Sequence, residues 1–257
     1  MNDLKMEDKK TTLEYWDKAY LKPPRLRLPS RFNLSICNAQ RLLKDHVKPG
    51  MHFLEIGCAP GKMLAWVSFA LKARVAGIDY SKRGIIYAQQ IFHAVGIEGD
   101  LRCEDIFNTT FKPGTFDIVY SNGVVEHFKD VKEIIRQHAV FLKPHGKALI
   151  VIPNLSGVWG ILTKWLAPDI LGMHNLPVMH PSSLKGVAPA DLVKDVRAYR
   201  AGHISLRHAV PPRGLPPTVT AIIGGVVDLL GFIQPFDIAP FCPTLVLEMT
   251  RLGGPTL

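Results

Sequence analysis

The strongest constraint on the fold is a regular alternation of short apolar runs with longer amphipathic ones between residues 51 and 152. The runs HFLEIG (52–57), RVAGID (74–79) and FDIVYS (116–121) have the length and composition of buried strands, and the segments between them carry apolar residues at helical spacing. Strands that alternate with helices are typical of βαβ units on a parallel sheet. The sequence therefore predicts an α/β domain with a doubly wound, mostly parallel sheet.

The rhythm changes beyond Pro153, where Trp, Leu, Gly and Pro are frequent and no clean period is present. This composition predicts an insertion of short helices and loops. Further along, we expect a helix over PADLVKDVRAYRAG (189–202), a strand over HISLRHAV (203–210) and a final strand over TLVLEMTR (244–251). No polar linker divides the chain, so these elements are expected to extend the same sheet rather than to form a second domain.

The formal net charge is +9 over 257 residues, and more than half of this excess lies in the first 50 residues. An apolar fraction of 47% with 21% charged residues is that of a folded globular protein, which excludes disorder. Several N-terminal cations stand in a proline-broken segment that is expected to be a loop. They are Lys18, Lys22, Arg25, Arg27 and Arg31. Such a segment suits phosphates, an anionic membrane surface or an acidic substrate, and the alternative is a solvated basic face.

Cysteine spacing and the apolar runs constrain the cellular location. The chain has four cysteines without short paired spacing, so neither a zinc site nor a disulfide framework is expected. The first ten residues lack an apolar segment of the kind that directs secretion. The most apolar run, residues 219–233, contains Asp228 and is shorter than a membrane span. We therefore expect a cytoplasmic protein that is soluble or peripheral to a membrane.

The turn after the first predicted strand has the sequence GCAPG, in which Gly57 and Gly61 bracket three residues. In an open α/β sheet, ligands bind at the carboxyl ends of the strands, and glycine there lets a ligand lie against bare backbone. A dinucleotide site has the pattern GxGxxG, in which the helix N-terminus holds the pyrophosphate. Here the middle glycine is missing, and Glu55 precedes the turn. A carboxylate at this place favours a ligand with positive charge over one with phosphates.

Two further acids follow the next strands. Asp79 ends the strand RVAGID, where a carboxylate can accept both hydroxyls of a ribose. Asp105 follows the third strand, where it can accept from an exocyclic amine while Ile106 covers a purine ring. Together with Glu55 and the glycine turn, these acids describe a pocket for an adenosine that is cationic and carries no phosphate. S-adenosylmethionine has this chemistry.

Residues 51–152 resemble the core of the class I S-adenosylmethionine-dependent methyltransferases. The acid-x-G-x-x-x-G turn, the ribose acid and the adenine-side pair have the order and spacing of that family, and YSNGVVEHF (120–128) resembles its segment after the fourth strand. EYWDKAY (14–20) resembles the N-terminal segment that folds over the cofactor in many members. The cofactor-binding residues that this resemblance implies are Tyr15, Tyr20, Glu55, Gly57, Cys58, Gly61, Asp79, Tyr80, Asp105, Ile106, Ser121, Asn122 and Gly123.

The resemblance also implies a Rossmann-like doubly wound fold, with a mostly parallel seven-stranded sheet, helices on both faces and an antiparallel edge strand. It implies one methyltransferase domain over residues 1–257 with three parts. These are an N-terminal cap segment (1–50), an S-adenosylmethionine-binding core (51–152) and an acceptor or lid region that includes the last two strands (153–257).

Methyl transfer needs a base only when the acceptor must lose a proton. His127 follows the fourth strand at the carboxyl edge of the sheet, where its imidazole can act as that base. The alternative is that His127 only holds a loop, and His174, His180 and His203 are rival candidates. The segment VVEHF also resembles ubiquinone-pathway O-methyltransferases, in which a further acid just upstream helps to hold a divalent metal ion. Gly123 stands here without such an acid, so no metal site is expected.

The acceptor is expected to bind in the region after Pro153, where six apolar residues can line a pocket or a lid, or simply complete the core. They are Trp159, Leu162, Trp165, Leu166, Leu171 and Met173. The segment after the fourth strand lacks the (N/D)PP(Y/F) pattern of base-modifying enzymes, which argues against nucleic-acid amines. The sequence predicts methyl transfer to a small hydrophobic or lipid-like molecule at oxygen. The alternatives are an RNA or protein methyltransferase that uses the basic N-terminal segment, and a non-catalytic protein that binds S-adenosylmethionine.

Overall fold

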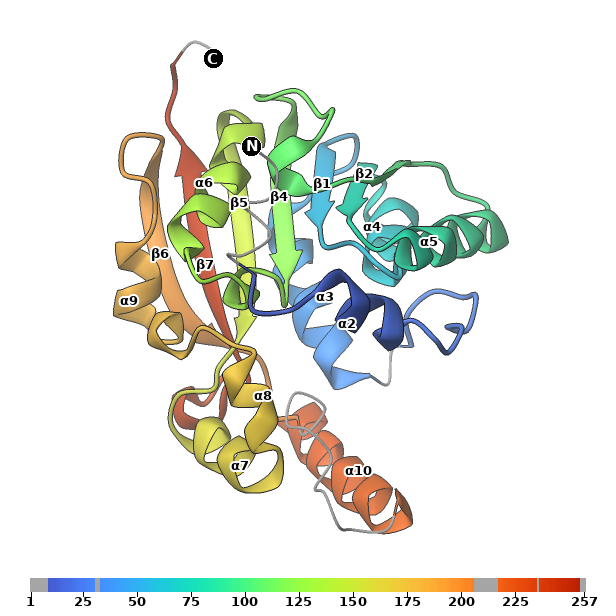
Figure 1. Cartoon of the computed structure of the whole chain (residues 1–257), viewed down its shortest axis with the longest axis vertical. Helices are drawn as coiled ribbons and strands as arrows, with labels where there is room; N and C mark the ends of the chain where they lie inside the picture. Colours follow the sequence, from blue (N-terminus) through green and yellow to red (C-terminus); the bar gives the residue numbers. More distant parts are fainter. Residues whose placement is uncertain (1–8, 31–32, 206–216, 235, 255–257) are drawn as a thin grey trace.

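The computed structural model describes residues 9–30, 33–205, 217–234 and 236–254. Within this part of the chain, seven strands form one sheet of order β3-β2-β1-β4-β5-β7-β6 (Figure 1). In chain order the strands are β1 (His52–Ile56), β2 (Arg74–Asp79), β3 (Asp100–Cys103), β4 (Phe116–Asn122), β5 (Leu142–Pro153), β6 (Val193–Ala201) and β7 (Thr244–Arg251). Strands β1 to β5 pair in parallel, while β7 runs antiparallel to β5 and β6. The expected doubly wound fold with an antiparallel edge is confirmed.

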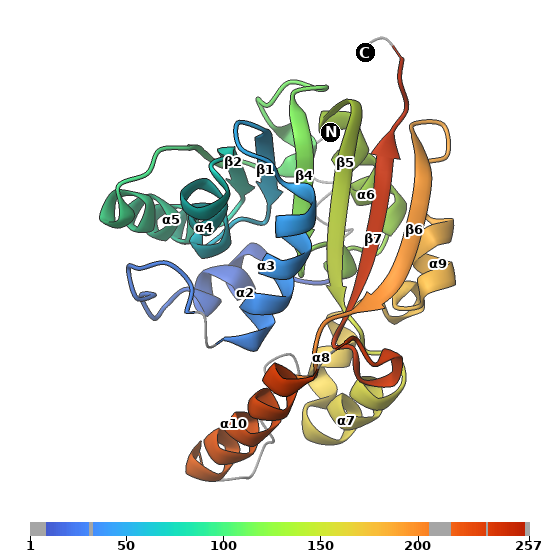
Figure 2. The ribbon, with the colours of Figure 1, turned by 180° about the vertical axis from the view of Figure 1, so that it is seen from behind.

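Helices cover both faces of this sheet (Figures 1 and 2). The helices are α2 (Leu13–Ala19), α3 (Leu34–His46), α4 (Lys62–Leu71), α5 (Lys82–Val95), α6 (Val131–Phe141), α7 (Val158–Leu166), α8 (Pro168–Gly172), α9 (Pro181–Gly186) and α10 (Pro217–Ile233). Short 3-10 turns are η1 (Ile106–Asn108), η2 (Val125–His127), η3 (Leu176–Val178) and η4 (Ala239–Phe241). Buried residues of α3, α4 and α5 pack on one face, and those of α6 and α9 pack on the other.

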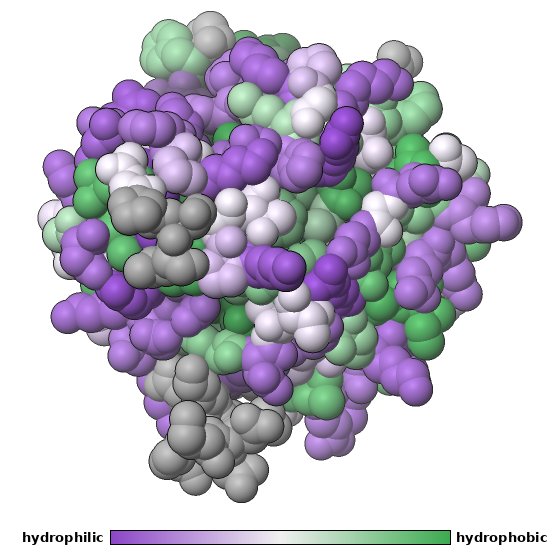
Figure 3. Space-filling view, turned by 90° about the horizontal axis from the view of Figure 1, so that it is seen from above, coloured by the Kyte–Doolittle hydropathy of each residue, from purple (hydrophilic) through white to green (hydrophobic). Residues whose placement is uncertain are grey.

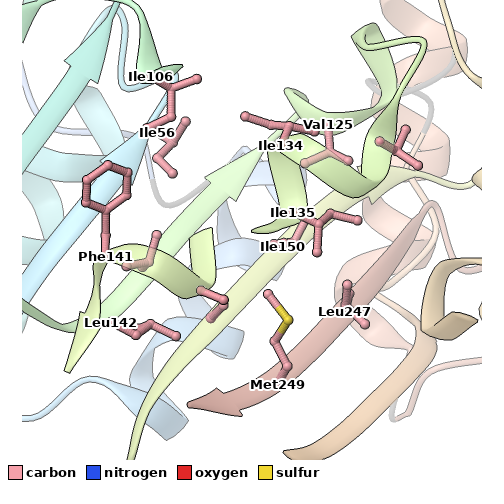
Figure 4. Close-up of a cluster of buried hydrophobic side chains, with 14 of the residues drawn as sticks. Ile56, Ile106, Val125, Ile134, Ile135, Phe141, Leu142, Ile150, Leu247 and Met249 are labelled. Atoms are coloured by element: carbon pink, nitrogen blue, oxygen red, sulfur yellow. The ribbon is translucent and has the colours of Figure 1, made fainter. Parts of the chain in front are cut away.

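Successive residues of a central strand point to opposite faces of the sheet, so each strand contributes to two cores. In β1, Phe53 packs with α3 and α4, whereas its neighbour Leu54 packs on the side of α6. On that side, Ile134 and Ile135 of α6 pack in one cluster with Ile150 of β5 (Figure 4). Because both faces are covered, these strands are apolar almost throughout, as the sequence indicates.

The expected helix over residues 189–202 is wrong, because Val193–Ala201 forms strand β6. The register of β6 shifts between Lys194 and Arg197, where two residues face one residue of β7. Asp195, inside this bulge, has a φ of 52°. The extra residue interrupts the alternation of the strand and gives its apolar residues spacings close to those of a helix.

The region after β5 contains the short helices α7, α8 and α9, as its composition predicts. The expected strand over 203–210 is not formed at 203–205, and residues 206–210 lie outside the described part of the chain. The final strand β7 has the bounds that the sequence predicts. All four cysteines are free thiols. Among the described helices, none is long and apolar enough to cross a membrane.

The basic N-terminal segment lies on the surface and is a loop from residue 21 onward, whereas Lys18 belongs to helix α2 and not to the expected loop. Residues 21–30 form neither helix nor strand, and the side chains of Lys22, Arg25 and Arg27 are exposed. Lys18 pairs with Glu14 on α2 at 2.7 Å. Arg31 lies outside the described residues.

A side chain at Gly77 of β2 is expected to destabilise the fold. A Cβ atom there would lie 2.6 Å from Cδ2 of Leu64 and 2.7 Å from Sγ of Cys58. We expect Gly77→Ala to lower the free energy of unfolding by about 1–3 kcal/mol in urea denaturation, because an overpacked core must shift. Gly172→Ala is the matched control, since nothing lies within 4 Å of a Cβ there. Equal effects of the two substitutions would contradict this account.

Candidate active site

A cavity of about 360 Å³ lies at the carboxyl ends of strands β1, β2 and β4. The order of the strands reverses at β1, because β2 and β3 lie on one side of it and β4 and β5 lie on the other. Open α/β sheets bind ligands at such a switch point. Helix α2 lies beyond these strand ends (Figure 1). Of the expected site residues, those that line the cavity are Tyr20, Gly57, Asp79, Tyr80, Asp105, Ile106, Asn122, Gly123 and His127.

Five expected residues, Tyr15, Glu55, Cys58, Gly61 and Ser121, are not among those that line the cavity. Glu55, Cys58 and Ser121 are instead buried in the core beside it. The cavity also has lining residues that the sequence did not predict. These are Lys9, Thr11, Trp16, Ile56, Ala59, Ile78, Glu104, Val124 and Phe128.

Helix α2 presents one face to the cavity. Trp16 and Tyr20, four residues apart, both line it, and the hydroxyl of Tyr20 donates to the carbonyl of Ala59 at 3.1 Å. Tyr15 is 41% exposed and contacts the edge of the Trp16 ring. Trp16 could have been predicted as a lining residue from its spacing to Tyr20, because residues i and i+4 lie on the same face of a helix.

The two glycines of the turn after β1 have positive φ, 72° at Gly57 and 87° at Gly61. A Cβ atom at Gly57 would lie 2.4 Å from Cγ2 of Val124, and one at Gly61 would lie 2.6 Å from Cβ of Ala88. The close approach that these glycines permit is therefore made by the protein itself. Gly57 also lines the cavity, so its backbone contacts Val124 on one side and borders the space for a ligand on the other.

Two carboxylates lie close together behind and beside the turn. Glu55 is buried, and its Oε2 has no hydrogen-bond partner among the described residues. Burial, reinforced by the charge of Asp79, raises the pKa of Glu55 well above its usual value. Asp79 accepts from the backbone N–H groups of Ser81 at 2.9 Å and Ala59 at 3.2 Å, but burial still raises its pKa. These buried acids fit a ligand that brings a positive charge.

The third acid, Asp105, already has a cationic partner. Nζ of Lys9 lies 2.6 Å from Oδ2 of Asp105 and 4.4 Å from the centre of the Tyr80 ring. The Lys9 side chain is 7% exposed. Oδ1 of Asp105 accepts from the backbone N–H of Phe107 at 3.0 Å. The N-terminal segment thus places an ammonium group against the carboxylate that the sequence assigns to adenine, Asp105, and against the Tyr80 ring.

His127 is held on the opposite side of the cavity by three neighbours. Its Nδ1 donates to the carbonyl of Met173 at 3.0 Å, so Nε2 presents a lone pair. The Trp16 ring meets it edge-on at 5.3 Å between centroids, and the His174 ring lies at 4.7 Å. Burial, with a smaller effect of His174, lowers the pKa of His127 to about 4. The imidazole is therefore neutral near pH 7 and can accept a proton, but its low pKa makes it a weak base.

Glu126, His127 and His174 each offer a ligand atom, and these atoms lie within 4.8 Å of one another. Nδ1 of both imidazoles donates to a backbone carbonyl, which leaves Nε2 to coordinate. Burial raises the pKa of Glu126 to about 8, and its Oε2 has no partner among the described residues. Two imidazoles and a carboxylate suit a divalent ion such as zinc. The sequence predicts no metal site because Gly123 stands where related enzymes have an acid, and His174 lies too far along the chain to enter that pattern. The absence of a metal stays a prediction.

Ser121 and Cys58 act behind the cavity wall. The Ser121 hydroxyl donates to Nε2 of His138 at 2.8 Å, and Nδ1 of His138 donates to the carbonyl of Ile134 at 2.8 Å. Burial raises the pKa of the Cys58 thiol. Both residues therefore support the turns after β1 and β4 through packing and hydrogen bonding.

The rival histidines lie apart from the cavity lining, except that His174 contacts His127. His203 lies 3.7 Å from Asp237, and His180 is exposed at the start of α9. The six apolar residues expected to bind the acceptor are also absent from the lining of this cavity. Trp159 is buried and donates to the carbonyl of Phe241 at 3.1 Å, whereas Trp165 is 81% exposed. The first belongs to the core and the second to the surface.

Comparison with known proteins agrees with this geometry. Residues 54–150 match the family model described as a methyltransferase domain. The chain is 32% identical over 106 residues to phosphoethanolamine N-methyltransferase 3 of Arabidopsis thaliana, which covers 40% of this chain and 21% of that protein. It is 31% identical over 156 residues to the ubiquinone biosynthesis O-methyltransferase of Bradyrhizobium diazoefficiens, which covers 58% of this chain and 60% of that protein. The chain thus matches only about a fifth of the length of the first relative.

Solved structures share the fold at low sequence identity. A SAM-dependent methyltransferase from Archaeoglobus fulgidus superposes with a TM-score of 0.58 at 16% identity, over 86% of this chain and 95% of that one. Phosphoethanolamine N-methyltransferase 2 of Haemonchus contortus, solved with S-adenosylhomocysteine, gives a TM-score of 0.56 at 15% identity, over 96% of this chain and 58% of that one.

The doubly wound sheet is the fold that this chain shares with solved methyltransferases, and the cavity lies at its switch point. The methyltransferase-domain match at residues 54–150, together with the shared fold, supports a class I S-adenosylmethionine-dependent methyltransferase whose cofactor is S-adenosylmethionine.

Two buried histidines are expected to make the protein less stable as the pH falls. Burial lowers the pKa of both His127 and His138 to about 4, so the unfolded chain gains these protons near pH 6.5 before the folded chain does. Each histidine therefore costs up to about 3 kcal/mol between pH 6.5 and 4. Urea denaturation at pH 7 and at pH 4.5 should show a smaller loss of stability in His138→Gln than in the unsubstituted protein.

The exposed His93 provides the matched control for this measurement. His93→Gln should keep the full pH dependence. The same pH dependence in His138→Gln and the unsubstituted protein would contradict the assignment of a neutral, buried His138.

Proposed function

We propose that this chain transfers the methyl group of S-adenosylmethionine to a small hydrophobic molecule, at an oxygen atom, in the cytoplasm. The observation that carries the proposal is the pairing of buried carboxylates on one side of the cavity with a neutral imidazole, His127, on the other. The first feature suits a cationic cofactor, and the second suits an acceptor that must lose a proton.

At the cofactor end, the proposal assigns Asp79 to the ribose hydroxyls and Asp105 with Ile106 to the adenine. Glu55 lies behind the turn with an unpartnered oxygen, and a bound cation would favour the ionised form of this buried carboxyl group. The backbone at Gly57 and Gly123 lines the space between these groups. When bound, the cofactor supplies an electrophilic methyl group.

At the acceptor end, the chain has to hold the acceptor at near-attack distance and remove its proton. Positioning alone can lower the barrier by about 7–11 kcal/mol. Nε2 of His127 carries the lone pair that takes the proton, since Nδ1 is committed to the carbonyl of Met173. The Trp16 ring beside His127 and the Phe128 ring in the cavity lining exclude water from this space.

The lining of the cavity favours an uncharged acceptor over a phosphorylated amine. A phosphate group needs cations, and among the described lining residues Lys9 is the single Lys or Arg. Lys9 is already paired with Asp105. The relatives include both O- and N-methyltransferases, and a neutral base beside an apolar cavity supports a hydroxyl acceptor.

The proposal is tested with methyl-labelled S-adenosylmethionine and three fractions of the host cell: an organic extract, total RNA and total protein. We expect label in the organic extract, and we expect His127→Gln to lower the rate about 100-fold or more while cofactor affinity changes little. Label in RNA or protein would instead support the alternative that uses the basic segment. Cofactor binding without label in any fraction would support a non-catalytic binding protein.

Lys9 is expected to compete with the cofactor for Asp105. Lys9→Met removes a positive charge from the site and frees the carboxylate, so S-adenosylmethionine should bind about 3- to 10-fold more tightly in calorimetric titration. Lys10→Met is the matched control, because Lys10 is the exposed neighbour and the change of charge is the same. Weaker binding in Lys9→Met alone would show instead that Lys9 holds the N-terminal segment over the cofactor.

A further inference from the structure

One end of the molecule carries an unusual number of exposed apolar side chains. Helices α7 and α10 both project at the lower end of the long axis, beyond the carboxyl ends of the parallel strands (Figures 1 and 2). We call their most exposed apolar residues the apolar tip. These are Ile161, Trp165, Ile222, Val226, Leu229 and Ile233, which are 53–81% exposed.

The tip residues lie on regular helical faces. In α10 the positions 222, 226, 229 and 233 are spaced by four, three and four residues, and in α7 the positions 161 and 165 are spaced by four. An apolar stripe at this spacing normally faces the core of a soluble protein. Here both stripes face outward.

The inward side of α10 shows that the helix is anchored and not simply unpacked. Oδ1 of Asp228, the one ionisable residue of α10, accepts from the Ser205 hydroxyl at 2.9 Å. A Cβ atom at Gly231 would lie 2.2 Å from the carbonyl oxygen of Ile204. The helix therefore docks through its small and polar residues, which leaves its large apolar residues outside.

The opposite end of the molecule has a different surface. Seen from above, it is covered mainly by hydrophilic side chains with scattered hydrophobic ones between them (Figure 3). The exposed apolar residues of α7 and α10 thus give the molecule one end that differs in polarity from the other.

Cations and apolar residues alternate in the loop that follows α2, residues 21–30, which we call the cationic loop. Lys22, Arg25 and Arg27 are exposed, and Leu21 and Leu26 between them are 62% and 48% exposed. Burial is the main cause of the lowered pKa of Lys62, and the nearby charges of Arg27 and Arg25 lower it further. This region therefore carries positive charge that no acid among the described residues balances. An anionic surface complements these cations, whereas a second copy of the chain presents the same cations and repels them.

We propose that the apolar tip and the cationic loop together dock on an anionic phospholipid bilayer, with the tip inserted among the headgroups and acyl chains. Interfacial helices bind bilayers through this combination of apolar area and cationic charge. The acceptor then enters the cavity from the lipid phase, a step that rests on the proposed function. Docking itself needs neither cofactor nor acceptor.

The test is sedimentation of the full chain with phosphatidylcholine vesicles and with vesicles that also contain phosphatidylglycerol. We expect binding to the phosphatidylglycerol vesicles, with a blue shift of tryptophan fluorescence that Trp165→Phe removes. The double variant Ile222→Glu with Leu229→Glu should lose about tenfold or more of the binding. Phe69→Glu is the matched control, since Phe69 is an exposed apolar residue of α4, and it should bind normally.

The cationic loop is tested in the same assay. Arg25→Gln with Arg27→Gln should lose the preference for phosphatidylglycerol, while Lys48→Gln with Lys72→Gln removes two exposed charges elsewhere and should keep it. Equal binding of the unsubstituted protein to both vesicles would overturn the anionic partner. Binding to neither vesicle, or a dimer that the α10 variant dissociates, would overturn the membrane assignment.

This assay contains no cofactor and no acceptor, so its failure is distinguishable from a failure of the proposed methyl transfer. A protein that labels an organic extract but ignores vesicles would retain the proposed function and lose the docking surface. A protein that binds vesicles but transfers no methyl group would do the reverse.

Discussion

The arrangement of the site depends on the missing side chain at Gly57. Cγ2 of Val124 lies too close to the position of a Cβ atom for any other residue to fit without a shift, so the turns after β1 and β4 pack tightly together. Gly61 does the same between α4 and α5, where Ala88 fills the space of a Cβ atom. The order of the strands reverses at β1, which lies between β2 and β4, and this creates the crevice. The two glycine contacts hold the turn after β1 in place beside it.

Acids gather around this floor without enough cations to balance them. Glu55 and Asp79 are buried, and their raised pKa values record the cost of keeping negative charge there. Nζ of Lys9 neutralises Asp105 at the rim, while His127 is kept neutral by burial on the opposite side. The cavity therefore has one side suited to a cation and another with a neutral imidazole, an arrangement that suits the proposed transfer from a sulfonium to a hydroxyl.

The sequence predicted the elements whose periodicity is regular and missed those that depend on distant contacts. Strands β1, β2 and β4 are buried on both faces and read as apolar runs, and β7 was predicted to the residue. Strand β6 was taken for a helix because its bulge at Asp195 disturbs the alternation. Lys9 could not be predicted, since its partner Asp105 is 96 residues away and no local pattern links the two. The turn residues, by contrast, were found because their chemistry and spacing are local.

The N-terminal segment is joined to the rest of the domain by few bonds. Nζ of Lys9 pairs with Asp105, the backbone N–H of Lys10 donates to the carbonyl of His127, the Tyr20 hydroxyl donates to the carbonyl of Ala59, and Asp17 accepts from the Ser81 hydroxyl. A unit of this size opens at a small fraction of the free energy needed to unfold the sheet. Exchange of spent for fresh cofactor would then require the tethers of residues 9–20 to break, whereas the sheet can stay folded.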